Sequence, residues 1–137
     1  MTVFTLHPRL AADSVPIGDL PLCRVLLMND SRFPWLILVP RQPDLREVID
    51  LSPADRGRLL EEIASASDAL RAAFSPDKLN LGAIGNIVPQ LHVHIVARFE
   101  TDPAWPGVVW GHSPALAYET AAAEERVADL RRRLIKA

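Results

Sequence analysis

The chain has 137 residues, of which 49% are hydrophobic and 23% charged, a balance that is typical of a folded soluble protein and excludes a disordered one. Its length predicts a single domain, residues 1–137, and its formal net charge of −2 provides no basic surface for nucleic acid. We expect a cytoplasmic protein without membrane contact, because no apolar stretch could cross a bilayer and "MTVFTLHPRL" lacks the pattern of a signal peptide.

The first part of the chain predicts an arm followed by a hairpin. Residues 1–21 contain several prolines and predict an irregular arm with a short strand near "VFTL". The apolar runs "LCRVLLM" (22–28) and "WLILV" (35–39) predict two buried strands, and the short turn "NDSRFP" between them favours an antiparallel pair. The lone cysteine, Cys23, lies in the first run, where we expect a buried thiol and not a nucleophile.

A long helix is predicted to follow. Ser52 as the N-cap, Pro53 at the first helical position and Asp55 in the first turn form a helix start. Apolar residues then recur at spacings of three and four and predict one buried face, formed by Leu59, Ile63, Ala66, Leu70 and Ala73.

The second half predicts two more strands and a final helix. "KLNLGAI" (78–84) and "QLHVHIVARF" (90–99) read as strands, and "PALAYETAAAEERVADLRRRLIKA" reads as a helix from about residue 114. This order of elements favours an α+β domain with an antiparallel sheet. The chain then divides into an N-terminal arm (1–21), a core (22–110) and a C-terminal helical extension (111–137).

Two histidines stand one residue apart in "VPQLHVHIVARF". Alternate residues of a strand share a face, so His92 and His94 should project together, with Gln90 behind them and Arg98 beyond. They can be ordinary strand histidines, or two ligands of a metal site with His112 or a nearby acid as the third. They can also act as nucleophile or acid–base groups on an anion, with Arg98 and the amides of "GNI" meeting its charge.

The stretch "QLHVHIVAR" resembles the signature of the histidine triad (HIT) family, His-x-His-x-His followed by two apolar residues and often an arginine. Other segments agree in order: "LLMND" and "WLILVPR" resemble the family's paired strands, "KLNLGAIG" the strand before the triad loop, and "AWPG" the Trp-Pro segment after it. The resemblance covers roughly residues 20–110.

The resemblance implies an α+β fold with an antiparallel sheet of about five strands, one long central helix and a C-terminal helix, usually in a homodimer. Family members hydrolyse or transfer nucleoside monophosphates from phosphoramidates, dinucleoside polyphosphates or sugar nucleotides through a nucleotidyl-histidine intermediate. They need no cofactor or metal, so the implied partner is a small nucleotide.

The resemblance also assigns roles by position. His92 would be the nucleophile, His94 would contact phosphate oxygens and Gln90 would orient the site. Asn29 or Asp30 would contact the ribose hydroxyls. The remaining residues expected at the nucleotide are Asn80 and Asn86 near the phosphate loop, Arg98, and Trp105 in the segment that reaches the partner's pocket.

Two departures from the family pattern matter. Gln90 stands in the first triad position, and glutamine cannot shuttle a proton at neutral pH. The protein then uses another acid, for which His112 is a candidate, or a leaving group that needs none. Pro34 and Trp35 replace a common Gly-His pair, and Trp35 either stacks on a base or belongs to the core. A nucleotide-binding or sensing protein with weak chemistry is the alternative to an enzyme.

Overall fold

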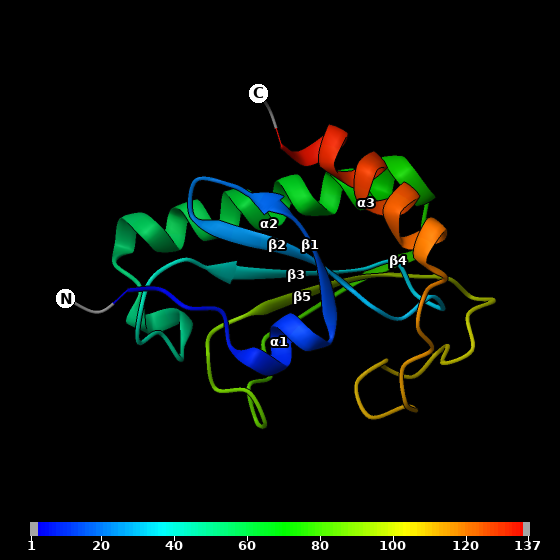
Figure 1. Cartoon of the computed structure of the whole chain (residues 1–137), viewed down its shortest axis with the longest axis horizontal. Helices are drawn as coiled ribbons and strands as arrows, with labels where there is room; N and C mark the ends of the chain where they lie inside the picture. The colour runs from blue at the N-terminus through cyan, green and yellow to red at the C-terminus, as the bar shows by residue number, and fades with distance from the viewer. Residues whose placement is uncertain (1–2, 136–137) are drawn as a thin grey trace.

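A five-stranded antiparallel sheet organises the computed structural model, which describes residues 3–135 (Figure 1). The strand order is β1-β2-β3-β5-β4. In chain order the elements are α1 (Pro8–Ala12), β1 (Ser14–Asp19), β2 (Cys23–Met28), β3 (Trp35–Pro40), a 3-10 helix (Val48–Asp50), α2 (Pro53–Phe74), β4 (Lys78–Gly82), β5 (Val93–Arg98) and α3 (Thr120–Leu134).

The two faces of the sheet are covered differently. Figure 1 shows α2 and α3 on one side, and α1 with the long loops on the other. Successive side chains of β5 point to opposite faces of the sheet. Val93 and Ile95 belong to the core beneath the helices, and Val96 belongs to a second core beneath the loops. The expected α+β fold with a hairpin of β2 and β3 is confirmed, and the histidines lie on the loop-covered side.

Helix α2 begins where its local sequence predicts. The Ser52 hydroxyl accepts from the Asp55 N–H over 3.1 Å, and Leu59, Ala66 and Leu70 are buried. The same helix buries Glu62, which accepts the backbone N–H groups of Leu22 and Cys23, each over 2.8 Å. These two bonds satisfy the turn between β1 and β2.

Cys23 is buried, as expected. Burial and the neighbouring Glu62 raise the pKa of its thiol well above the ordinary value. A thiol held protonated in this way is no nucleophile, so Cys23 contributes packing.

Three expectations about element boundaries are wrong. Residues 3–7 form no strand, and the supposedly irregular arm contains α1 and β1. The histidine strand begins at Val93 and not at residue 90, because the Leu91 N–H bonds to the Leu45 carbonyl, outside the strand ladder. The C-terminal helix begins at Thr120, after an irregular segment, and the last two positions of the expected extension lie outside the described residues.

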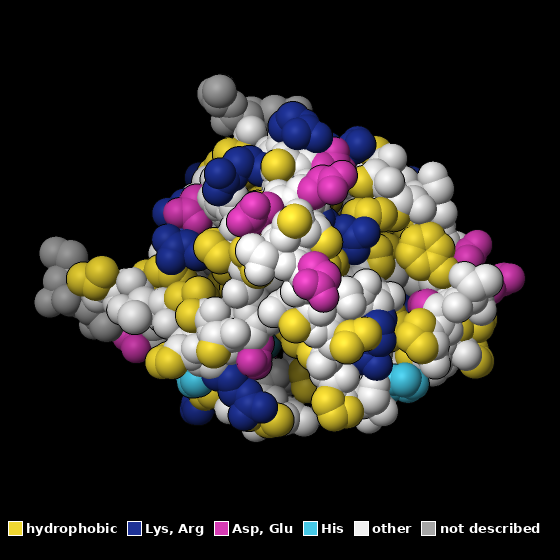
Figure 2. Space-filling model, turned by 45° about the vertical axis from the view of Figure 1, so that its right-hand side comes forward, with side chains coloured by type: hydrophobic (Ala, Val, Ile, Leu, Met, Phe, Trp, Pro, Cys, Tyr) yellow, Lys and Arg dark blue, Asp and Glu magenta, His cyan; other side chains and the backbone are white. Residues whose placement is uncertain are grey.

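The surface carries charges of both signs. On the face shown in Figure 2, basic and acidic side chains are interspersed, in line with the net charge of −2. Within residues 3–135, no helix combines the length and the apolar character that crossing a bilayer requires.

Candidate functional site

The candidate site lies at the start of β5, where His92 ends a loop and His94 is the second residue of the strand. Both side chains are buried, and their ring centroids are 4.9 Å apart at an interplanar angle of 69°. The expectation that the two imidazoles project together is therefore correct.

A backbone carbonyl fixes the orientation of His92. Its Nδ1 lies 2.6 Å from the carbonyl oxygen of Gln90, and a carbonyl can only accept, so Nδ1 carries the hydrogen. In the neutral ring this leaves the lone pair on Nε2. A nucleophilic imidazole needs this tautomer.

His94 is held by a different donor. The indole Nε1–H of Trp35 donates to its Nδ1 over 3.0 Å, so the hydrogen of neutral His94 is on Nε2. Burial, and to a lesser extent the neighbouring His92, lowers the pKa of His94 to about 4. His94 is therefore a neutral hydrogen-bond donor near pH 7 and not a cation.

An apolar cavity of about 400 Å³ is lined by both histidines. This volume is within the range of small-ligand sites. Its other walls are formed mainly by Leu10, Met28, Trp35, Ile37, Ile87, Val88, Val109 and Trp110, with polar groups from Asp13, Asp30, Asn86 and Ser113.

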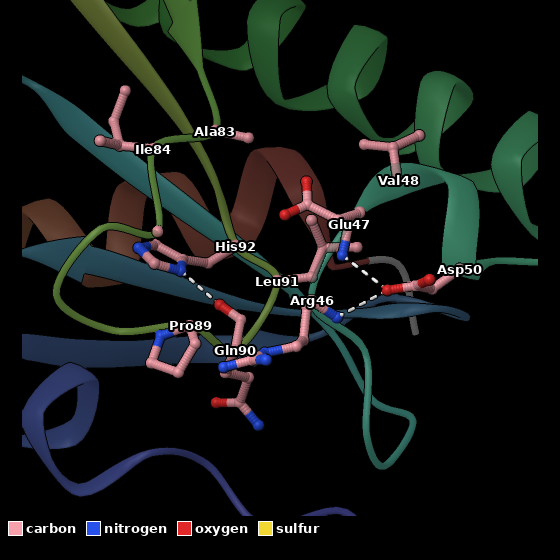
Figure 3. Close-up of a pocket in the computed structure, with 11 residues that line it drawn as sticks. Arg46, Glu47, Val48, Asp50, Ala83, Ile84, Pro89, Gln90, Leu91 and His92 are labelled. Carbon is pink, nitrogen blue, oxygen red and sulfur yellow. Dashed lines mark hydrogen bonds between the residues drawn. The ribbon is translucent and has the colours of Figure 1, made fainter.

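His92 also lines a second, polar cavity of about 490 Å³ (Figure 3). His92, Ile84 and Gly85 line both cavities, so the imidazole stands where the two meet. The charged groups of the polar cavity are Arg46, Glu47 and Asp50. The Asp50 carboxylate accepts hydrogen bonds from the backbone N–H groups of Arg46 and Glu47.

Trp110 closes the apolar cavity beside His94, with their ring centroids 5.6 Å apart. Its indole packs against Gly82 of β4 so closely that a Cβ there would lie 3.2 Å from the ring. Its Nε1–H is buried and has no hydrogen-bond partner among the described residues. A buried donor without a partner is uncommon in folded proteins, and this one lies in a cavity wall.

The side chain of Gln90 points to the arm and not to the histidines. Its Nε2 donates to the carbonyl of Thr5, and its Oε1 accepts the backbone N–H of His7, each over 2.9 Å. The contact of Gln90 with His92 runs through its backbone carbonyl alone.

Of the two candidate ribose contacts, Asp30 lines the apolar cavity. It accepts from the Arg32 guanidinium, which also bonds to the Ser113 hydroxyl and the Pro114 carbonyl. Burial would raise the pKa of Asp30, but the bonds from Arg32 outweigh it and lower the pKa. Asn29 instead accepts the backbone N–H of Tyr118.

Three other expected residues form a separate cluster. The Arg98 guanidinium is bonded to Asp102 and Asn80 and lies over the ring of Trp105. Arg98 lies four residues beyond His94 on the strand, which places it about 13 Å away. None of Arg98, Asn80 and Trp105 lines either of the two cavities that meet at His92.

Asn86 and His112 differ in their relation to the cavity. Asn86 lines it, whereas His112 is exposed, bonds to Ser113 and is not among the lining residues. Within residues 3–135, no three His, Cys, Asp or Glu side chains are grouped so that they could hold a metal ion.

Sequence reasoning missed the contribution of the arm to this site. Leu10 and Asp13 of the arm line the apolar cavity, and His7 caps α1 by accepting from the Arg9 N–H. The pair "HP" at residues 7–8 was an available signal, because an N-cap followed by proline starts a helix. The bond from Trp35 to His94 had no local signal.

Comparisons with known proteins agree with this architecture. The model of the HIT domain matches residues 9–101. Histidine triad proteins from Bradyrhizobium japonicum and Sinorhizobium meliloti are each 47% identical with a TM-score of 0.94, over 97% and 98% of this chain and 99% of theirs. One from Marinobacter aquaeolei is 45% identical with a TM-score of 0.94, over 97% of both chains. A search of curated protein sequences gave no match. With more than half of its length matched by the domain model and a fold shared end to end with these structures, the chain belongs to the HIT family.

Proposed function

We propose that the protein is a nucleotide hydrolase or nucleotidyltransferase that acts on a phosphorus-containing bond through His92. The observation that carries this proposal is the bond from His92 Nδ1 to the Gln90 carbonyl, which leaves Nε2 as the free nitrogen. Family membership supports a nucleotide as the ligand.

The proposed reaction has two displacements. In the first, the Nε2 lone pair attacks phosphorus, the P–Nε2 bond forms, and the bond to the leaving group breaks. The leaving group departs with the electron pair and takes a proton from solvent. The Gln90 carbonyl stabilises the positive charge that the His92 ring then carries. In the second, water or an acceptor hydroxyl attacks phosphorus and gives its proton to solvent. The P–Nε2 bond breaks, and its electron pair returns to Nε2, which releases the nucleotide and restores His92.

The two cavities suit the two parts of such a substrate. The apolar cavity would hold the nucleoside, with Asp30 and Asn86 as its polar contacts and neutral His94 donating from Nε2 to phosphate. The polar cavity would hold the leaving group. Its charged side chains are one cation, Arg46, and two anions, Glu47 and Asp50, and this balance disfavours a leaving group with several negative charges.

The test is release of nucleoside monophosphate from an adenosine phosphoramidate, a diadenosine polyphosphate and a nucleotide sugar. Wild type, His92→Ala and the surface control His112→Ala would be compared, each with and without chelator. We expect turnover that disappears only in His92→Ala and ignores chelator, and a trapped covalent intermediate on His92 by mass spectrometry. Equal turnover by His92→Ala would contradict the mechanism.

A nucleotide-binding protein without turnover is the second candidate. It is favoured by the engagement of the Gln90 amide with the arm, which leaves no proton-transfer group at that position. Binding of a nucleoside monophosphate by wild type without turnover of any substrate would select this candidate.

A homodimer joined through β4 is also part of the proposal. β4 lies at one end of the sheet, and Leu81 on it and Leu60 on α2 are both more than half exposed. At the other end, β1 carries Pro16 and an irregular register, and Arg131 of α3 donates to its Ile17 carbonyl. Such features block strand pairing, so the β4 edge is the one open to a second copy.

A further inference from the structure

The Gln90 amide makes a paired contact with an extended segment of the arm. In an extended chain, the C=O of one residue and the N–H two residues later point to the same side. Gln90 meets this pair at Thr5 and His7 with one donor and one acceptor, each over 2.9 Å. A primary amide offers a donor and an acceptor side by side, because one of its N–H bonds lies on the same side as its C=O. The two nitrogens of an imidazole point in diverging directions and cannot make both bonds.

This contact fixes the segment that walls the apolar cavity. His7 starts α1, whose Leu10 is buried against the cavity, and Asp13 follows at the end of the helix. The Asp13 carbonyl accepts the backbone N–H of Asn29 over 3.0 Å, so the segment is tied down at both ends. Residues 5–13, the wall segment, thus lie between the Gln90 clamp and the end of β2.

We propose that Gln90 is a positioning residue that clamps the wall segment over the nucleoside cavity and thereby sets the affinity for nucleotide. The inference rests on the proposed nucleotide-binding function. It gives the glutamine a role that differs from that of a proton shuttle, at the position that the resemblance assigns to the first triad histidine. The same residue holds His92 through its backbone carbonyl, so the clamp and the nucleophile share one anchor.

Calorimetric binding of adenosine and guanosine monophosphate tests the clamp. Gln90→Ala removes the side-chain amide that makes both hydrogen bonds, and His7→Pro removes the backbone N–H that donates to Gln90 Oε1. The φ of −55° at His7 suits proline, so this change adds no strain at that residue. His7→Ala is the matched control for His7→Pro, because both lose the imidazole that caps α1 and only the proline also loses the N–H.

We expect Gln90→Ala and His7→Pro each to weaken binding roughly three- to tenfold, as the loss of one or two hydrogen bonds predicts. The double variant should be no weaker than His7→Pro, because both changes break the same contact. His7→Ala loses only the imidazole cap of α1 and should bind more tightly than His7→Pro. In turnover, KM should rise in parallel with the weaker binding.

Hydrogen exchange without nucleotide gives a second readout, in which Gln90→Ala should speed exchange across the wall segment. A loss of kcat with unchanged binding, additive effects in the double variant, or unchanged binding despite faster exchange would each overturn the inference. Absence of binding by wild type would overturn the proposed function itself, whereas wild-type binding that Gln90→Ala leaves intact would overturn only the clamp. Thermal unfolding of each variant shows whether it is folded.

Discussion

Trp35 donates its indole N–H to Nδ1 of His94 over 3.0 Å, from the strand next to the one that carries the histidine. The tryptophan thereby selects the tautomer of His94 and leaves Nε2–H as the only ring donor. It also packs edge-on against the imidazole, with the ring centroids 5.7 Å apart. Trp35 is thus a core residue that also holds the ring of His94, and it lines the apolar cavity.

Replacement of Trp35 by phenylalanine should lower kcat/KM about three- to tenfold, because the aromatic ring remains while one hydrogen bond to His94 is lost. Steady-state kinetics on whichever substrate is turned over would measure this. Trp105→Phe is the matched control, since that indole lies over Arg98 and outside the cavity. An unchanged kcat/KM in Trp35→Phe would show that the tautomer of His94 does not matter.

Stability should fall as the pH drops from about 6.5 to about 4, because of His94. The pKa of this residue is about 4 in the folded protein, and its ordinary value is 6.5. The unfolded chain therefore binds more protons between these values, so the stabilisation is complete above pH 6.5 and is lost toward pH 4. Its size is at most on the order of 3 kcal/mol.

Denaturant unfolding of wild type, His94→Gln and His112→Gln across this pH range would measure the effect. The exposed His112 is the control, and its variant should follow the wild-type curve. His94→Gln should flatten the curve between pH 4 and 6.5. A wild-type slope that persists in His94→Gln would assign the pH dependence to another group.

What could be predicted from the sequence was local. The start of helix α2 is predicted by Ser52 and Pro53, and its buried face by the spacing of Leu59, Ala66 and Leu70. All of these signals lie within one segment, and the helix forms as expected. The alternation that places His94 and Val96 on one face and Val93 on the other is likewise a local property of a strand.

What could not be predicted depends on contacts distant in sequence. Gln90 turns toward Thr5 because the arm passes beside it, and Arg98 bonds to Asn80, which precedes it by 18 residues. Glu62 is buried by its contact with a turn forty residues earlier. None of these partners lies within the window in which a hydrophobic period or a capping signal operates.

Asp102→Asn should destabilise the fold by about 3–5 kcal/mol, because it leaves the buried Arg98 guanidinium without its charge partner. The two side chains are only 2% and 3% exposed, and they form a 2.8 Å ion pair. Burial would raise the pKa of Asp102, but the bonds from Arg98 and from backbone N–H groups lower it to about 2. Its contribution to stability is therefore present above pH 3.8 and is lost as the pH falls toward 2.

The matched control is Asp129→Asn, which breaks an exposed pair with Arg133 and should cost less than about 1 kcal/mol. Chemical denaturation at neutral pH measures both variants, and calorimetry measures the nucleotide affinity of the folded fraction. We expect that affinity to change less than about twofold, in keeping with the distance of roughly 13 Å along the strand. If Asp102→Asn loses much of its nucleotide affinity without losing stability, Arg98 must contact the nucleotide after all.

Leu81→Lys should convert the proposed homodimer to a monomer. The side chain is 56% exposed on the β4 edge, and an apolar groove between β4 and α2 continues from it past Leu60 and Ile63. A lysine on an edge strand opposes pairing with a second copy, because it places two like charges and their water at the contact. Sedimentation equilibrium of wild type, Leu81→Lys and the control Leu116→Lys would measure the mass of each protein in solution.

The control residue, Leu116, is similarly exposed, at 58%, but lies in the segment before α3, so its variant should stay dimeric. If Leu81→Lys is still a dimer and Leu116→Lys is not, the interface lies over the C-terminal segment and not along β4.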